Sequence, residues 1–201
     1  MSFEADLSNA VSGIQNVLTS LNQYSPSSNL GIVTFDGQGY INASLQPVGT
    51  NYSSLQSTIN SIVDCADGGP PCSGSDLAAG MATGISLFSA SGYSPPAGTR
   101  KAIIFVSDGA ANVTSKCVNS SLTDAQDNSL AASEANNAYT SQNISVFSVL
   151  YYHGSDTQTD VNAMQALIQG QGVFINEPTA TQLPTDLQSI ITNNLSMQLS
   201  Q

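Results

Sequence analysis

The feature that most constrains the fold is the run Lys101–Ser107, which reads Lys-Ala-Ile-Ile-Phe-Val-Ser and is followed by Asp108-Gly109. Its interior is apolar at every position, without the alternation expected of a strand that faces solvent on one side. Such continuous runs are typical of strands buried on both faces in parallel sheets. The run Ile144–Leu150 is predicted to be another central strand, and a helical segment at about 123–141 separates the two. Two such strands joined by a helix predict a right-handed crossover.

The rest of the chain continues the alternation of strands and helices. Helices are predicted at 3–24, 52–63, 160–169 and 181–199 and from Asp76 to Phe88, and shorter strands at 30–35, 40–45 and 172–175. The turn Asp36–Gly39 joins two of these strands into a hairpin. We therefore predict an α/β fold with a doubly wound, mostly parallel sheet and helices on both faces, in a single domain over residues 1–201.

Charge excludes several classes of partner. Lys and Arg total 3 against 14 Asp and Glu, which gives a net charge of −11 and repels nucleic acids and anionic membranes. Only 8% of the residues are charged, so Ser, Thr, Asn and Gln must build the polar surface, as suits a protein outside the cytoplasm. The sequence contains neither a run of about 18 apolar residues nor a signal peptide at Met1. We expect any signal or membrane anchor to lie upstream.

The cysteines point to an oxidising compartment. Cys65 and Cys72 flank a segment rich in Gly and Pro that could close a small loop by a disulfide; the alternative is a pair of free thiols. Cys117 would then have no assigned partner. The spacing matches no zinc site, because the chain has no further cysteine and His153 is its one histidine.

Two polar segments are predicted to meet at one edge of the sheet. Asp108 directly follows a central strand, and Ser73–Asp76 opens the helix that continues to Phe88. Ligands of doubly wound sheets bind at the carboxyl ends of the strands. Carboxylate and hydroxyl oxygens suit a hard cation, Mg²⁺ or else Mn²⁺ or Ca²⁺, that keeps a position open for a carboxylate of a protein partner. The alternative is that these side chains only cap helices or bond to turns.

Catalytic patterns are missing from the sequence. It has no Gly-x-Ser-x-Gly elbow and no phosphate-binding loop with its lysine, and His153 has no serine or cysteine partner at a recognisable spacing. We therefore expect no enzymatic activity. The remaining acidic residues are interpreted as solvated loop and cap residues: Asp64, Asp67, Asp124, Asp127, Asp156 and Asp160.

Three segments together resemble the von Willebrand factor A family. Leu30–Asp36 is similar to its second strand, Ser73–Met81 to its Gly-Gly-Thr-Asx-Leu turn, and Ile103–Asn112 to its strand ending in Thr-Asp-Gly. The resemblance implies a Rossmann-like fold and a metal-ion-dependent adhesion site in which Ser75 and Asp108 are ligands.

The family's remaining motif, Asp-x-Ser-x-Ser at the end of its first strand, has no counterpart here. The chain opens with Met1 and goes directly into a helix, so the resemblance implies a domain truncated before its first, central strand. The neighbouring strands would lose a pairing partner, and the cation would lose most of its oxygen ligands.

The segment Val146–Ser155 resembles A-type domains of bacterial tight-adherence (Tad) pilus-assembly proteins. This implies an extracytoplasmic module, membrane-anchored in the full-length protein, that serves adhesion or assembly of a surface structure. The alternative is a degenerate, metal-free domain whose loops 64–75 and 110–122 form a scaffold contact in an envelope complex.

Overall fold

The strands form two separate sheets in the computed structural model, which describes residues 3–62, 74–90, 93–113, 121–151, 157–177 and 182–190. The first is an antiparallel hairpin of β1 (Asn29–Phe35) and β2 (Gly39–Pro47). The second is parallel, in the order β3 (Lys101–Ser107), β4 (Ile144–Tyr151) and β5 (Phe174–Glu177).

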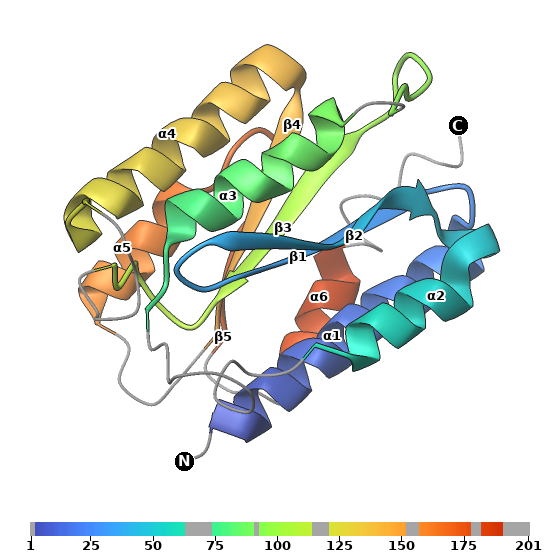
Figure 1. Cartoon of the computed structure of the whole chain (residues 1–201), viewed down its shortest axis with the longest axis horizontal. Coiled ribbons are helices and arrows are strands. Elements are labelled where there is room, and N and C mark those ends of the chain that lie inside the picture. Colours follow the sequence, from blue (N-terminus) through green and yellow to red (C-terminus); the bar gives the residue numbers. More distant parts are fainter. Residues whose placement is uncertain are drawn as a thin grey trace.

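Helices cover both faces of this arrangement (Figure 1). One layer contains α3 (Leu77–Ser86), which continues into a short 3-10 turn at Leu87–Ser89, together with α4 (Asp124–Gln142) and α5 (Gln158–Ala166). The other contains α1 (Phe3–Tyr24), α2 (Val48–Asn60) and α6 (Leu183–Ser189). The predicted α/β class with a parallel sheet and helices on both faces is therefore confirmed.

The position of β4 at the centre of the parallel sheet explains why its sequence is mostly apolar. It pairs with β3 from Lys101–Ile144 to Ser107–Leu150, and with β5 on its other edge. Val146 and Leu150 pack toward α3, α4 and α5, whereas Phe147 and Val149 pack toward α1 and α6. Both faces of β4 are thus covered, which favours apolar side chains, although Ser148 is also buried there.

Local capping sets where several helices begin. The Asp76 carboxylate accepts a 2.6 Å hydrogen bond from the Ala79 N–H, which confirms the predicted helix start. Reciprocal capping boxes open α4 at Thr123 and α5 at Thr157. The cap at Thr157 also explains why α5 starts at Gln158, two positions before the predicted start.

Two other predicted boundaries were displaced. The helix expected at 52–63 begins at Val48, and the strand expected at 172–175 lies at Phe174–Glu177. A Cβ on Gly172 would lie 1.7 Å from the Val146 carbonyl oxygen, so the backbone is too close there for any side chain. The last predicted helix, 181–199, is described only as far as 190.

Candidate functional site

Ser75 and Asp108 lie at the same end of one groove, at the carboxyl ends of β1 and β3. Asp108 is exposed and directly follows β3, while Ser75 is half-buried and directly precedes the α3 cap. The Asn112 N–H donates to the Ser75 carbonyl oxygen at 2.9 Å, which ties the two loops together. The convergence expected of these segments is therefore present in the backbone.

The Asp36 turn joins the same cluster of loops. The Asp76 N–H donates to the Asp36 carbonyl oxygen at 2.7 Å, so the end of the β1 strand holds the segment that carries Ser75. Gly80, one turn into α3, lets the Phe35 ring approach so closely that a Cβ there would lie 2.7 Å from it. The polar end of the groove is thus fixed by backbone contacts on both sides.

The loop after Asp108 is held by a carboxylate from α5. Asp160 Oδ1 accepts from the Ala110 N–H at 2.8 Å, while Oδ2 accepts from Thr157. Burial raises the pKa of Asp160, but the hydrogen bonds donated by Ala110 and Thr157 outweigh it and leave the pKa below its ordinary value. The sequence indicated only a solvated cap, because nothing local links Asp160 to Ala110.

A buried carboxylate lies beneath the start of α3. Asp127 is 0% exposed, and its Oδ2 accepts from the N–H groups of Leu77 (2.9 Å) and Ala78 (3.4 Å). Burial raises the pKa of Asp127 to about 7, and the hydrogen bond and charge of the neighbouring Asp76 raise it further. The backbone hydrogen bonds from Ala78 and Leu77 lower this pKa but do not outweigh the burial. The interpretation of Asp127 as a solvated residue was therefore wrong.

Glu134 on α4 adds a third carboxyl group to this region. Burial raises its pKa, and the charge of Asp76 adds to the effect. Asp127 Oδ1 and Glu134 Oε2 are buried without a hydrogen-bond partner among the described residues. A proton on Asp127 Oδ1 would remove that deficit, because it could be donated to Asp76.

The donor set at the groove end fits a hard cation only in part. An exposed carboxylate at Asp108 and a hydroxyl at Ser75 are oxygen ligands of the kind that Mg²⁺ prefers, but Mg²⁺ takes a full octahedral shell. Within the described residues, no group of three or more His, Cys, Asp or Glu side chains is placed to hold a metal ion. The other ligands would have to come from water or from another segment.

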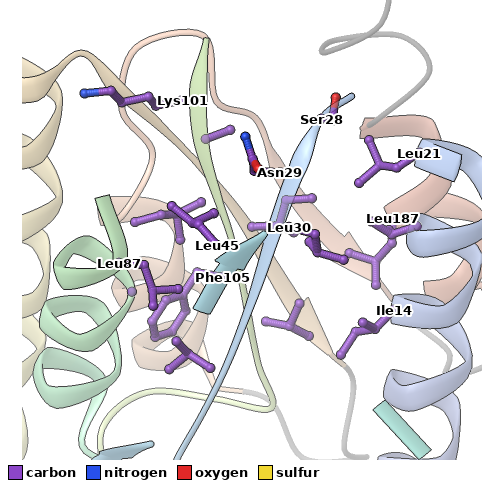
Figure 2. Close-up of a pocket in the computed structure, with 18 of the residues that line it drawn as sticks. Ile14, Leu21, Ser28, Asn29, Leu30, Leu45, Leu87, Lys101, Phe105 and Leu187 are labelled. Atoms are coloured by element: carbon purple, nitrogen blue, oxygen red, sulfur yellow. The ribbon is translucent and has the colours of Figure 1, made fainter. Parts of the chain in front are cut away.

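The groove itself has a volume of about 1130 Å³. Figure 2 shows Leu30 of β1 and Phe105 of β3 inside it, with Leu87 on the α3 side and Ile14, Leu21 and Leu187 on the side of α1 and α6. Its walls are therefore apolar along the strands and polar at both ends, with Ser28, Asn29 and Lys101 at the end opposite Ser75 and Asp108.

Several predicted features lie outside the described residues. These are the cysteines Cys65, Cys72 and Cys117 with the expected disulfide, His153, and most of the loops 64–75 and 110–122. Of the helices that the structure describes, none combines the length and the apolar character needed to cross a bilayer.

Comparison with known proteins gives both a sequence family and structural neighbours. The family model of the von Willebrand factor type A domain matches residues 2–190, whereas no curated protein matches the chain. The structure resembles proximal thread matrix protein 1 from the mussel byssus, with a TM-score of 0.67 and 15% identity over 94% of this chain. The match covers only 42% of that protein.

Two further neighbours come from pili. The vWF domain of the type V pili tip protein Mfa5 from Porphyromonas gingivalis has a TM-score of 0.66 and 12% identity, over 92% of this chain and 87% of that one. The pilus adhesin SpaC from Lactobacillus rhamnosus GG has a TM-score of 0.61 and 14% identity, over 91% of this chain and 27% of that one. At these identities the likeness concerns the fold.

Proposed function

Because the chain belongs to the von Willebrand factor type A domain family, we propose that it is a non-enzymatic, extracytoplasmic module that binds a protein partner in adhesion or in assembly of a pilus or another surface structure. The observation that carries the proposal is the convergence of Ser75 and Asp108 at the polar end of the groove. Structural neighbours that are a pilus tip protein and a pilus adhesin support the same role.

In this proposal Asp108 and Ser75 hold a divalent cation, Mg²⁺ or else Mn²⁺ or Ca²⁺. The bound cation would attract an acidic side chain of the partner into its open position. Asp160 acts on the site through the backbone, since its bond to Ala110 fixes the loop that begins at Asp108. A basic partner face would also be drawn to the net charge of −11.

A finer proposal places the module in a Tad-type pilus-assembly protein with a membrane anchor elsewhere in the polypeptide. It rests on the segment Val146–Ser155, whose first part forms the buried strand β4. Low charge content and a surface of uncharged polar residues support an extracytoplasmic location.

The second candidate is a metal-free scaffold domain of the same family. The observation that favours it is that, among the described side chains, no group of three or more His, Cys, Asp or Glu residues is placed to hold a metal ion. The two candidates differ in whether a cation binds at all.

Calorimetric titration of the chain with MgCl₂ and with MnCl₂ tests the choice. We expect saturable binding that Asp108→Ala abolishes and that Asp186→Ala preserves. Asp186 is a matched control, since it is a carboxylate in the first turn of α6 and does not line the groove. Binding that survives Asp108→Ala, or no binding of either cation, would favour the scaffold function.

A further inference from the structure

A second, smaller pocket lies at the end of the parallel sheet opposite Asp108. Its volume is about 120 Å³, and it is formed where β3 and β4 begin, beside the end of α4 and the loop that precedes β5. None of the described residues that line it is acidic. The polar residues among them are Arg100, Lys101, Tyr139, Asn143, Ser145 and Gln171.

Most of the basic residues of the chain lie at this pocket. The sequence has three Lys and Arg residues against 14 Asp and Glu. Arg100 and Lys101 line the pocket, and the third, Lys116, lies outside the described residues. Arg100 precedes β3, so the alternation of side chains along a strand does not send it to the face opposite Lys101. Two like charges at one small pocket repel each other, and a bound anion would offset this repulsion.

Both cations donate to neutral acceptors. Lys101 Nζ donates to the Gln142 carbonyl oxygen at 3.3 Å, which the negative end of the α4 dipole explains. Figure 2 shows the Lys101 side chain extending away from the interior of the large groove. Arg100 is exposed, and its Nη1 donates to Gln171 Oε1 at 3.0 Å. A guanidinium has five N–H donors, so one bond to a neutral amide leaves most of its capacity for a ligand.

Backbone contacts hold the wall opposite these cations. The Gln171 N–H donates to Ser145 Oγ at 3.3 Å, which ties the loop before β5 to β4. Gly170 has a φ of 63°, and a Cβ there would lie 2.5 Å from Tyr139 Cε2, so this loop packs directly on the Tyr139 ring. Tyr139 nevertheless remains 38% exposed. The partner of Arg100 is therefore on a fixed loop beside an accessible aromatic ring.

Size and chemistry select the ligand. A volume of about 120 Å³ is well below the roughly 300–1,000 Å³ of pockets that enclose a whole small molecule, but it can receive the end of one side chain. The planar fork of arginine matches the geometry of a carboxylate. Arginine and tyrosine are also the residue types that commonly anchor protein interfaces. A net charge of −11 disfavours a polyanion such as a nucleic acid.

We propose that this pocket binds a carboxylate side chain of an acidic segment in a protein partner, with Arg100 and Lys101 as the charged donors and Tyr139 as the flanking apolar contact. β3 separates the pocket from Asp108 by seven residues, or about 23 Å at about 3.3 Å per residue. One carboxylate cannot reach both places. This contact is therefore additional to the one made through a cation in the proposed function and does not depend on it.

Amide NMR titration with matched peptides tests this proposal. The probe is acetyl-Gly-Glu-Gly-amide, and the control is acetyl-Gly-Gln-Gly-amide, which has the same shape without the charge. Both are added in EDTA and ~0.15 M NaCl, where a Debye length of about 8 Å limits repulsion by the rest of the acidic chain. We expect the glutamate peptide to shift the amide signals of Gln171 and Asn143 with a Kd on the order of 1–10 mM. The glutamine peptide should leave both signals unchanged.

Substitutions on both sides of the pocket sharpen the test. Arg100→Gln should weaken binding of the glutamate peptide about tenfold or more, because hydrogen bonds to a charged donor are lost. Gln56→Glu also makes the net charge one unit more negative, but at an exposed position of α2, and should leave the Kd unchanged. Gln171→Glu keeps both cations and places a carboxylate beside Arg100, where Gln171 Oε1 lies at 3.0 Å. It should therefore compete with the peptide and abolish binding.

Sodium acetate separates a protein partner from a free anion. It carries the same carboxylate but offers no backbone to the rim, so it should bind at least about threefold more weakly than the peptide. Acetate that binds as tightly as the peptide would overturn the assignment of a protein partner. Equal shifts with the two peptides, or a Kd that Arg100→Gln leaves unchanged, would refute the carboxylate site itself. EDTA removes any cation from Asp108, so this inference and the proposed function can fail separately.

Discussion

Asp127 should make the folded state less stable as the pH rises from 5 to 8. Its pKa is about 7 in the folded protein against an ordinary value of 3.8. Well below pH 3.8 the carboxyl is protonated in both states, so it has no effect there. Between the two pKa values the unfolded chain releases a proton that the folded protein retains, and folding loses free energy as the pH rises.

The size of the effect follows from the shift. A raised pKa of about 7 implies a penalty of roughly 4 kcal/mol at alkaline pH, since each unit corresponds to about 1.4 kcal/mol. About 3 kcal/mol of this develops between pH 5 and pH 8. Asp127→Asn removes the ionisation but keeps an oxygen that accepts from Leu77 and Ala78, and its amide can donate to Asp76.

Urea denaturation at pH 5 and pH 8 measures the difference. We expect Asp127→Asn to be more stable than the parent at pH 8 by up to a few kcal/mol, with a smaller gap at pH 5. Glu134 also has a raised pKa, so the variant keeps part of the pH dependence. Asp186→Asn, in the first turn of α6, serves as a control that should leave the slope unchanged. Parallel pH profiles for Asp127→Asn and the parent would refute the reasoning.

Three further substitutions test the packing by urea denaturation. Asp160→Ala should lower the free energy of unfolding by about 2 kcal/mol at neutral pH, because it removes a helix cap and the acceptor of the Ala110 N–H. This loss of stability should shrink as the pH falls through the lowered pKa of Asp160. A loss that does not change with pH would contradict this role. Gly172→Ala should lower the free energy of unfolding by at least about 3 kcal/mol, because the new Cβ would overlap the Val146 carbonyl oxygen. An unchanged stability would mean that the backbones of Gly172 and Val146 are farther apart than described. Leu18 is 1% exposed and packs between α1 and the hairpin, so Leu18→Ala should lower the free energy of unfolding by about 2–5 kcal/mol. A loss under about 1 kcal/mol would show that this face of α1 is not packed.

The elements with strong periodicity were predictable from the sequence. The helix predicted at 3–24 is α1, and the strand predicted from the run Lys101–Ser107 is β3. In both, the apolar pattern extends over the whole element, and each end is marked by polar or turn residues. The placement of Ser75 and Asp108 at one edge also followed, because parallel strands bring their carboxyl ends together.

The roles of Asp127 and Asp160 could not be predicted in the same way. Each lies in the first turn of a helix, where an acidic residue is ordinary. Their partners, Leu77 and Ala110, lie 50 residues away in the chain. Only the packing of α4 beside α3, and of α5 beside the loop after β3, brings these groups together.

The outer strand of the hairpin bears on how the protein behaves at high concentration. Strands at the end of a sheet are commonly protected by lysine, but β2 contains no charged residue and exposes Tyr40 (41%) and Ile41 (50%). Mutual repulsion between whole molecules, each with a net charge of −11, therefore helps to keep this strand from joining a neighbour. Colloidal stability should therefore fall in concentrated salt and as the pH approaches the isoelectric point near 4.1.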